Sequence, residues 1–230
     1  MTEAIVEEGC SFCAELAGGD PLDAVRAAGP RVEWIDSGWA LLPSVGPIGS
    51  AHLLLAPRDH ETFALPCDSA VGLVRVLARH FAEACSPGRV VFFEHANSAT
   101  GCGVTHAHVH AVSLSSDRPL EDLFADLGLS QANSLEALSL ERREIFWAMD
   151  NQGELFAQAG TRIPSQSARR AVARANGVSF ETDWKKYTDE AWYRTSLLMA
   201  RRIAPLLRAS RGVRASRAFG FETSAAATHV

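Results

Sequence analysis

The sequence has little of what several protein classes require. No apolar run in the 230 residues approaches the roughly 20 residues of a membrane span, and Met1 to Ala4 lack a basic secretory region. Five cysteines are too few for a disulfide framework in a chain of this length. The net charge of −5 makes nucleic acid and anionic membranes unexpected partners. These absences predict a cytoplasmic globular protein that is long enough to bury a substantial core.

Three of the eight histidines alternate at His106, His108 and His110, with only Ala107 and Val109 between them. Alternate side chains of an extended strand share a face, so we expect the three imidazoles to form a ladder on one side. Neutral imidazole is a nucleophile, a proton carrier and a metal ligand. The pattern therefore indicates phosphoryl or metal chemistry, and the spacing alone does not separate the two.

A second motif lies near the N-terminus, where Cys10 and Cys13 form a C-x-x-C. This spacing suits two thiolates that hold a zinc ion from one tight turn, and it also suits a redox pair. His60 follows a sharp turn at the end of an apolar segment and is a candidate third ligand. His52, at the start of that segment, is expected to be a packed or hydrogen-bonded core residue.

Hydrophobic periodicity predicts an α+β fold, in which an antiparallel sheet is covered by one main helix at residues 68–84. The predicted strands are 31–36, 39–42, 52–56, 89–94, the histidine segment and 154–157, and the other predicted helices are 14–29, 120–127, 135–149, 165–175 and 188–207. We expect a catalytic domain over residues 1–116 and a mostly helical extension over 117–209 that packs on it. Residues 210–230 show no periodicity and are expected to be disordered.

These motifs occur in the same order in a known superfamily. Cys10-Ser11-Phe12-Cys13, then Pro47 to His60, then the His-x-His-x-His segment resemble the histidine triad (HIT) superfamily over roughly residues 8 to 115. The resemblance is to its zinc-containing branch, which includes bacterial dinucleoside polyphosphate hydrolase-like proteins and, more distantly, galactose-1-phosphate uridylyltransferase. It implies a HIT-like fold and a structural zinc ion bound by four residues, namely Cys10, Cys13, His60 and His106.

The resemblance also implies a reaction. His108 would be the nucleophile that attacks the α-phosphorus of a nucleotide and forms a nucleotidyl-histidine, while His110 would hold the ring and share protons with the phosphate or the leaving group. His106 would anchor the ladder to the zinc. A loop of Gly101, Cys102 and Gly103 can turn backbone N–H groups toward phosphate oxygens, although it can equally be a simple tight turn.

The chain departs from the family pattern at several positions. The uridylyltransferases carry Gln where this chain has His110, which disfavours sugar-phosphate uridylyl transfer. Gly103 stands where many hydrolases have Ser or Thr, and Ser44 is the approximate counterpart of an Asp that contacts the ribose. Glu94-His95-Ala96 replaces a common Asn-x-Gly. For the nucleoside base, Phe12 and Leu42 offer an apolar wall.

The C-terminal half carries a further resemblance, to an extension of some bacterial triad proteins, at residues 163–170 and 183–186. Here Ser165 is a plausible helix N-cap. Gln166 and Arg169 are candidates to reach over the active site toward a distal phosphate or leaving group. For any one arginine, a solvated helix face is the more common position.

Together these features predict a hydrolase that cleaves a dinucleoside polyphosphate or nucleotide conjugate at the α-phosphate through His108. The first alternative is a nucleotidyltransferase or phosphorylase that uses the same intermediate with another acceptor. The second is a nucleotide-binding module without turnover, and the third is a redox protein built on Cys10 and Cys13. A small-molecule nucleotide is the expected partner, and a homodimer is a further prediction.

Overall fold

The computed structural model describes residues 7–19, 30–64, 68–85, 88–96, 105–138, 140, 144–160, 163–164, 166–178 and 189–218. The helices are α1 (Ser11–Leu16), α3 (Asp68–Cys85), α4 (Leu120–Leu123), α5 (Leu135–Leu138), α6 (Ser167–Ala175) and α7 (Glu190–Ala218), with a 3-10 turn at Ala125–Leu127. The strands are β1 (Glu33–Trp34), β2 (Trp39–Pro43), β3 (His52–Pro57), β4 (Arg89–Ala96), β5 (Val109–Leu114), β6 (Ser130–Gln131), β7 (Ile145–Asp150) and β8 (Leu155–Ala159).

The strands form one eight-stranded sheet in the order β1-β2-β3-β5-β4-β7-β8-β6, and every neighbouring pair is antiparallel. Strand β5, which carries His110, lies in the interior of this sheet between β3 and β4. Its register places His110 opposite Leu54 on one side and Phe93 on the other. The expected antiparallel α+β sheet is therefore confirmed.

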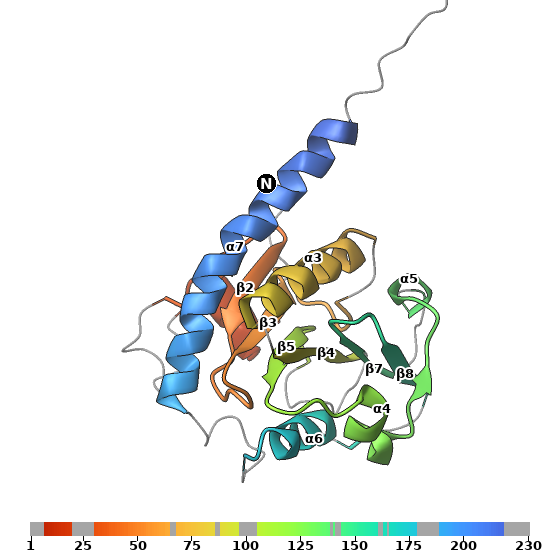
Figure 1. Ribbon diagram of the computed structural model, residues 1–230. Coiled ribbons are helices and arrows are strands. Elements are labelled where there is room, and N and C mark those ends of the chain that lie inside the picture. Colours follow the sequence, from red (N-terminus) through yellow and green to blue (C-terminus); the bar gives the residue numbers. More distant parts are fainter. Residues whose placement is uncertain are drawn as a thin grey trace, which may run out of the picture.

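Helices α3 and α7 cover one face of the sheet (Figure 1). Val71, Val74, Leu77 and Phe81 recur along α3 at helical spacing and are all buried against this face. The same apolar cluster includes Ile203 and Leu207 of α7. This face thus holds the largest part of the hydrophobic core.

The opposite face is covered in two separate patches. Helix α1 contributes Phe12 and Leu16 to a small cluster over β2 and β3, while α4 and α6 pack over β4, β5 and β7 (Figure 1). His110 stacks on Phe93, a member of the α4–α6 cluster, and His108 stacks on Phe12, a member of the α1 cluster. The histidines therefore lie between the two apolar patches.

The helix predicted over residues 135–149 was wrong beyond its first turn. Helix α5 ends at Leu138, and Ile145 to Asp150 form strand β7, which is buried on both of its faces. A short apolar run with both faces buried has no alternation, so periodicity alone cannot separate it from a buried helix. Strand β7 pairs with β4, and the sheet therefore continues across residue 116 into the part expected to be mostly helical.

Two further differences concern element boundaries. Strand β5 begins at Val109, so His106 and His108 precede the regular strand. Helix α7 continues to Ala218, so the expectation of disorder was wrong for residues 210–218, whereas 219–230 lie outside the described residues. The strands predicted at 39–42, 52–56, 89–94 and 154–157 and the helices at 68–84 and 165–175 are confirmed apart from small shifts of their ends. The helix predicted at 188–207 is present within the longer α7, whereas the one predicted at 120–127 is divided into α4 and the 3-10 turn. In the described part of the chain, no helix combines the length and the hydropathy needed to cross a membrane.

Candidate active site and metal centre

The two cysteines of the C-x-x-C meet two histidines at one end of the ladder. Cys10, Cys13, His60 and His106 each direct one ligand atom to a common point, and these four atoms lie within 4.8 Å of one another. The Nδ1 atom of His106 is 3.8 Å from Cys10 Sγ and 3.4 Å from Cys13 Sγ, and His60 Nδ1 is 3.2 Å from Cys13 Sγ. Ligand atoms around a tetrahedral zinc ion stand about 3.3–3.8 Å apart, so the cluster has the size and the donor set of a structural zinc site.

Local structure explains how residues so far apart in sequence converge. Cys10 is the N-cap of α1 and its Sγ accepts a hydrogen bond from the Cys13 N–H, which holds both sulfurs on one turn. The N–H of Ala107 donates to the carbonyl of Glu61 at 2.6 Å, and this bond ties the start of the triad to the segment after His60.

The second nitrogen of each candidate histidine ligand is also held. His106 Nε2 lies 2.8 Å from the Pro57 carbonyl and therefore donates to it, and His60 Nε2 lies 2.5 Å from the Glu7 carboxylate. Both bonds leave Nδ1 as the ligand atom, which is the usual outer-shell arrangement around metal-binding imidazoles. Burial lowers the pKa of His106, so this imidazole is in the neutral form that a metal requires.

His108 is the next histidine of the ladder. One of its ring nitrogens is hydrogen-bonded to the protein, and the other carries a lone pair. Its Nδ1 lies 2.8 Å from the backbone carbonyl of His106, so this nitrogen carries the hydrogen and Nε2 carries the lone pair. Burial lowers the pKa of His108 to about 4, which keeps the ring neutral at pH 7. A neutral imidazole with a fixed tautomer and an unprotonated Nε2 is suited to nucleophilic attack.

His110 is oriented through a fourth histidine. The backbone N–H of Ile48 donates to His52 Nδ1 at 3.3 Å, and His52 Nε2 lies 2.9 Å from His110 Nδ1. Although the Gly46 carbonyl acts to raise the pKa of His52, burial lowers it well below its usual value, so the ring is neutral. The Ile48 N–H favours the His52 tautomer with its hydrogen on Nε2, and in this tautomer the hydrogen is donated to His110 Nδ1.

The hydrogen bond from His52 determines which nitrogen of His110 carries the hydrogen. Since Nδ1 accepts a hydrogen bond and burial keeps the pKa of His110 well below its usual value, the remaining hydrogen is on Nε2. Among the described residues, no polar atom lies within hydrogen-bond distance of this buried nitrogen. The ring itself is fixed by stacking on Phe93, with centroids 4.5 Å apart and planes at 13°. An oriented, unpartnered N–H donor next to the lone pair of His108 suits an anionic oxygen of a ligand.

Helix α6 places a positively charged side chain, that of Arg169, near the histidines. Arg169 is buried, its Nη2 donates to the Gly46 carbonyl at 2.7 Å, and its charge helps to lower the pKa values of His52, His108 and His110. The helix is held against the sheet by Asn176, whose Nδ2 donates to the carbonyls of Ile48 and Ser113. Arg169 is thus buried near the histidines, and the solvated helix face that is more common for an arginine does not apply to it.

The other residues predicted for ligand binding lie in different surroundings. Phe12 stacks on the rings of His106 and His108, at centroid distances of 5.5 and 5.1 Å. Ser44 is buried, and its hydroxyl donates to the Gly46 carbonyl at 3.3 Å. Gln166 is the N-cap residue of α6 and has a left-handed backbone with φ of 64°. Gly101, Cys102, Gly103 and Ser165 lie outside the described residues.

Sequence reasoning missed two residues that orient the site. Glu7 holds His60, and a glutamate three positions before the C-x-x-C gives no signal of that contact. His52 was expected to be a hydrogen-bonded core residue, which is correct, but its partner was not expected to be His110. The alternation of residues 52, 54 and 56 on β3, antiparallel to the triad, was the one available indication that His52 shares the face of His110.

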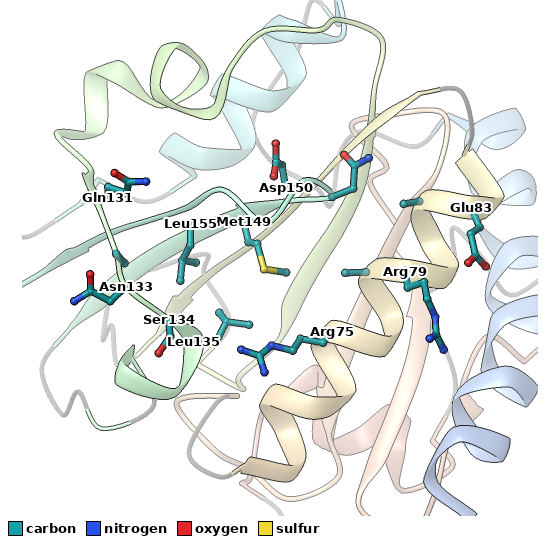
Figure 2. A pocket seen from close by; sticks show the side chains of 15 residues that line it. Arg75, Arg79, Glu83, Gln131, Asn133, Ser134, Leu135, Met149, Asp150 and Leu155 are labelled. Atoms are coloured by element: carbon teal, nitrogen blue, oxygen red, sulfur yellow. The ribbon is translucent and has the colours of Figure 1, made fainter. Parts of the chain in front are cut away.

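A groove of about 690 Å³ opens on the other side of the sheet, between α3, α5 and the β7–β8 turn (Figure 2). Its lining includes Arg75 and Arg79 of α3, Asn133 and Ser134 before α5, and Met149 of β7. None of its lining residues is a histidine or a cysteine. This groove is therefore separate from the histidine ladder and from the metal centre.

Comparison with solved structures finds similar chains of the histidine triad type. A histidine triad protein from Clostridium difficile matches with 20% identity and a TM-score of 0.36 over 50% of this chain and 97% of its own. A hypothetical histidine triad nucleotide-binding protein from Sulfolobus tokodaii matches with 13% identity and a TM-score of 0.38 over 86% of this chain and 94% of its own. A zinc-bound histidine triad family protein from Mycobacterium smegmatis matches with 19% identity and a TM-score of 0.35 over 57% of this chain and 93% of its own.

No protein-family model matches the sequence, and neither does any curated protein. The identities and TM-scores of the three similar structures are too low to transfer a ligand or a reaction to this chain. The chemistry must therefore be inferred from the residues of the site.

Proposed function

We propose that this protein is a zinc-stabilised histidine triad enzyme that cleaves a nucleotide at its α-phosphate through a covalent bond to His108. One observation carries the proposal. The backbone carbonyl of His106, the residue that also faces the two cysteines, accepts the Nδ1 hydrogen of His108 and leaves Nε2 with its lone pair. The candidate metal centre is thus joined to the candidate nucleophile through two residues of one chain segment.

The reaction would proceed by two displacements. His108 Nε2 attacks the α-phosphorus, the bond from phosphorus to the leaving group breaks, and the nucleotide is left on the histidine. Water then attacks the same phosphorus, the phosphorus–nitrogen bond breaks, and His108 recovers its lone pair. Each displacement inverts the phosphorus, so the net result is retention of configuration. The Nε2 hydrogen of His110 and the charge of Arg169 would stabilise the negative oxygens in both transition states.

Zinc, when bound, supplies structural cross-linking at this end of the strand, because four protein ligands leave no open coordination position. Cys10, Cys13, His60 and His106 would hold it. The substrate class that we propose is a dinucleoside polyphosphate or a nucleotide conjugate. The leaving group of a dinucleoside polyphosphate is a negatively charged phosphate chain, which is electrostatically complementary to the buried cation Arg169. This complementarity supports the proposed substrate class.

A second candidate, nucleotide binding without turnover, is favoured by the cover over the nucleophile. His108 is only 9% exposed and its ring lies against Phe12, so the lone pair of Nε2 has little access to a ligand in this conformation. A substrate would have to displace part of that cover before attack. A binding module would not need that displacement.

Product analysis with diadenosine tetraphosphate tests the proposal. The wild-type protein would be incubated with this substrate, with and without inorganic phosphate, beside a His108→Ala variant whose zinc content and melting temperature are checked first. The protein would also be quenched in acid-free denaturant and digested, so that mass spectrometry can locate an adenylyl group on the peptide that contains His108.

The outcomes separate the candidates. Production of AMP and ATP that is lost in the variant supports the hydrolase, while ADP that forms only with phosphate indicates a phosphorylase. Tight binding of the nucleotide without products or adduct would favour the binding module and contradict the proposal. Products that persist in His108→Ala would show that another group carries the reaction.

A further inference from the structure

Another histidine, His95, lies on β4, the strand next to β5. The pairing of β4 with β5 places Phe93 opposite His110, and the two rings stack on the ladder face of the sheet. Residues two apart on a strand share a face, so His95 lies on this same face. The β4–β5 pairing ends at Phe93 and His110, so His95 lies two residues beyond it, at the end of the sheet where the segment of His106 and His108 enters β5.

His95 differs from the ladder histidines in its partner. Its Nε2 lies 2.8 Å from the carboxylate of Glu144, which immediately precedes β7. The side chain of His95 is 4% exposed and that of Glu144 is 25% exposed, so the pair is shielded on the histidine side and open to water on the carboxylate side. The edge of Phe146 borders the His95 ring at a centroid distance of 6.4 Å. The carboxylate of Glu144 on one nitrogen holds the imidazole of His95 in one orientation.

With a nucleotide conjugate as substrate, the proposed reaction needs a proton donor that the histidine ladder does not supply. A leaving group that departs from phosphorus as an alkoxide, phenoxide or amide ion needs a hydrogen. The hydrogen of His108 is engaged with the carbonyl of His106, and the hydrogen on His110 Nε2 belongs to a neutral imidazole, which is far too weak an acid to give it up. These two rings can attack phosphorus and bind oxygen, but they cannot protonate a departing group.

We infer that His95, paired with Glu144, is the proton-transfer group of the site, acting as acid on the leaving group and then as base on the incoming acceptor. The inference rests on the proposed function of His108. In the first displacement the leaving group takes a proton from the His95 imidazolium as its bond to phosphorus breaks. In the second, water gives a proton to the now neutral His95 as its oxygen bonds to phosphorus, and His108 departs neutral. The sum is addition of one water across the broken bond, with His95 protonated again.

A pair of matched substrates tests this role. The phenyl and 4-nitrophenyl esters of AMP would be compared in single-turnover experiments that follow release of the phenol. 4-Nitrophenolate departs readily without a proton, whereas phenolate does not. The variant His95→Gln keeps a hydrogen-bonding group near Glu144 but cannot transfer a proton at neutral pH.

We expect His95→Gln to slow the first turnover of the phenyl ester by at least about 100-fold, and that of the 4-nitrophenyl ester by less than about threefold. Glu144→Gln should give a smaller loss with the same selectivity. Phe146→Leu, which changes packing beside His95 and leaves the proton in place, serves as the control and should affect both esters equally.

An equal loss on both esters would assign His95 a structural role and overturn the inference, as would unchanged cleavage of the phenyl ester. These results leave the proposed function intact, because the wild type still cleaves both esters. If the wild type cleaves neither ester and forms no adduct on His108, the proposed function fails and this inference fails with it.

Discussion

The face of the sheet under α3 and α7 and the face with the histidines bury ionisable groups in different ways. Under α3 and α7, the carboxyl group of Glu94 is surrounded by apolar side chains and bonded to two N–H donors, from Ala64 and from Trp147. On the other face, His52 contacts His110 and His108 is bonded to the carbonyl of His106, and among the described residues the buried Nε2 atom of His110 has no hydrogen-bond partner. A face that is satisfied internally contributes stability, and a face with directed, unsatisfied atoms is prepared for a ligand.

The largest predicted effect is a loss of activity when the histidine face is altered and the face under α3 and α7 is left unchanged. His108→Gln should lower turnover of a nucleotide substrate by more than about 10³-fold, because the nucleophilic nitrogen is removed. The melting temperature and the zinc content should stay close to those of the wild type, since the Gln side chain can donate to the same carbonyl. Steady-state kinetics, calorimetry and metal analysis measure the three quantities. A variant that loses zinc together with activity would show that the ladder and the metal centre are not separable.

The second prediction concerns the point where the ladder meets the metal centre. Cys13→Ser should abolish zinc binding and lower the free energy of unfolding by on the order of 5 kcal/mol, because a buried four-ligand site loses a thiolate. Activity should fall with it, since His106 loses its anchor. Cys85→Ser is the matched control: this half-buried thiol packs near Met199 under α7 and lies outside the cluster. Stoichiometric zinc in the Cys13 variant would contradict the assignment.

The third prediction uses pH to probe the face under α3 and α7. Burial raises the pKa of Glu94 to about 8 in the folded protein, from an ordinary value of 4.5. Below pH 4.5 the group is protonated in both states. Between pH 4.5 and 8 the unfolded chain ionises while the folded protein does not, so stability falls by about 1.4 kcal/mol per pH unit and then levels off.

Glu94→Gln removes this titration. The unfolding free energy of the wild type, measured relative to that of the variant by urea denaturation, should therefore decline by a few kcal/mol from pH 5 to pH 8. Activity at a fixed pH should change little as long as the variant is folded. Parallel stability curves for the two proteins across this range would contradict the raised pKa.

The smallest effect is expected from the residue that orients the ladder without touching the substrate. His52→Leu should reduce turnover about 10- to 100-fold and cost about 2 kcal/mol of stability, because His110 Nδ1 and the Ile48 N–H lose their partner. His52→Gln offers an amide oxygen to Ile48 and an amide hydrogen to His110, so it should restore much of the activity. If Leu and Gln behave alike, the role of His52 is packing alone.

The parts of the site that follow from local spacing could be predicted from the sequence. The C-x-x-C and the turn before His60 indicated three candidate metal ligands, the family resemblance implied His106 as the fourth, and the structure brings these side chains together. The covering helix was predicted because its apolar side chains recur at helical spacing. The C-x-x-C, the alternating histidines and the helix pattern each depend on residues close together in the chain.

Features that depend on pairing between distant strands could not be predicted in the same way. Strand β7 reads as an uninterrupted apolar run because both of its faces are buried, and only its pairing with β4 reveals it as a strand. The contact of His95 with Glu144 follows from that same pairing, so it too was out of reach. The hydrogen bond from His52 to His110 depends on the position of the Ile48 backbone N–H. The position of a backbone atom cannot be predicted from the residue type.

The series from Ile48 through His52 to His110 has a direction. Each ring accepts on one side and gives on the other, so the backbone N–H at one end decides what the far end presents to a ligand. Reversing that first link, for example by offering His52 a carbonyl in place of the N–H, would reverse every link after it. His110 would then present a lone pair, which repels phosphate oxygens and attracts cations. Under the proposed function, the preference of the site for an anionic ligand would depend on a main-chain atom in the loop before β3, which substitutions of the Ile48 side chain leave in place.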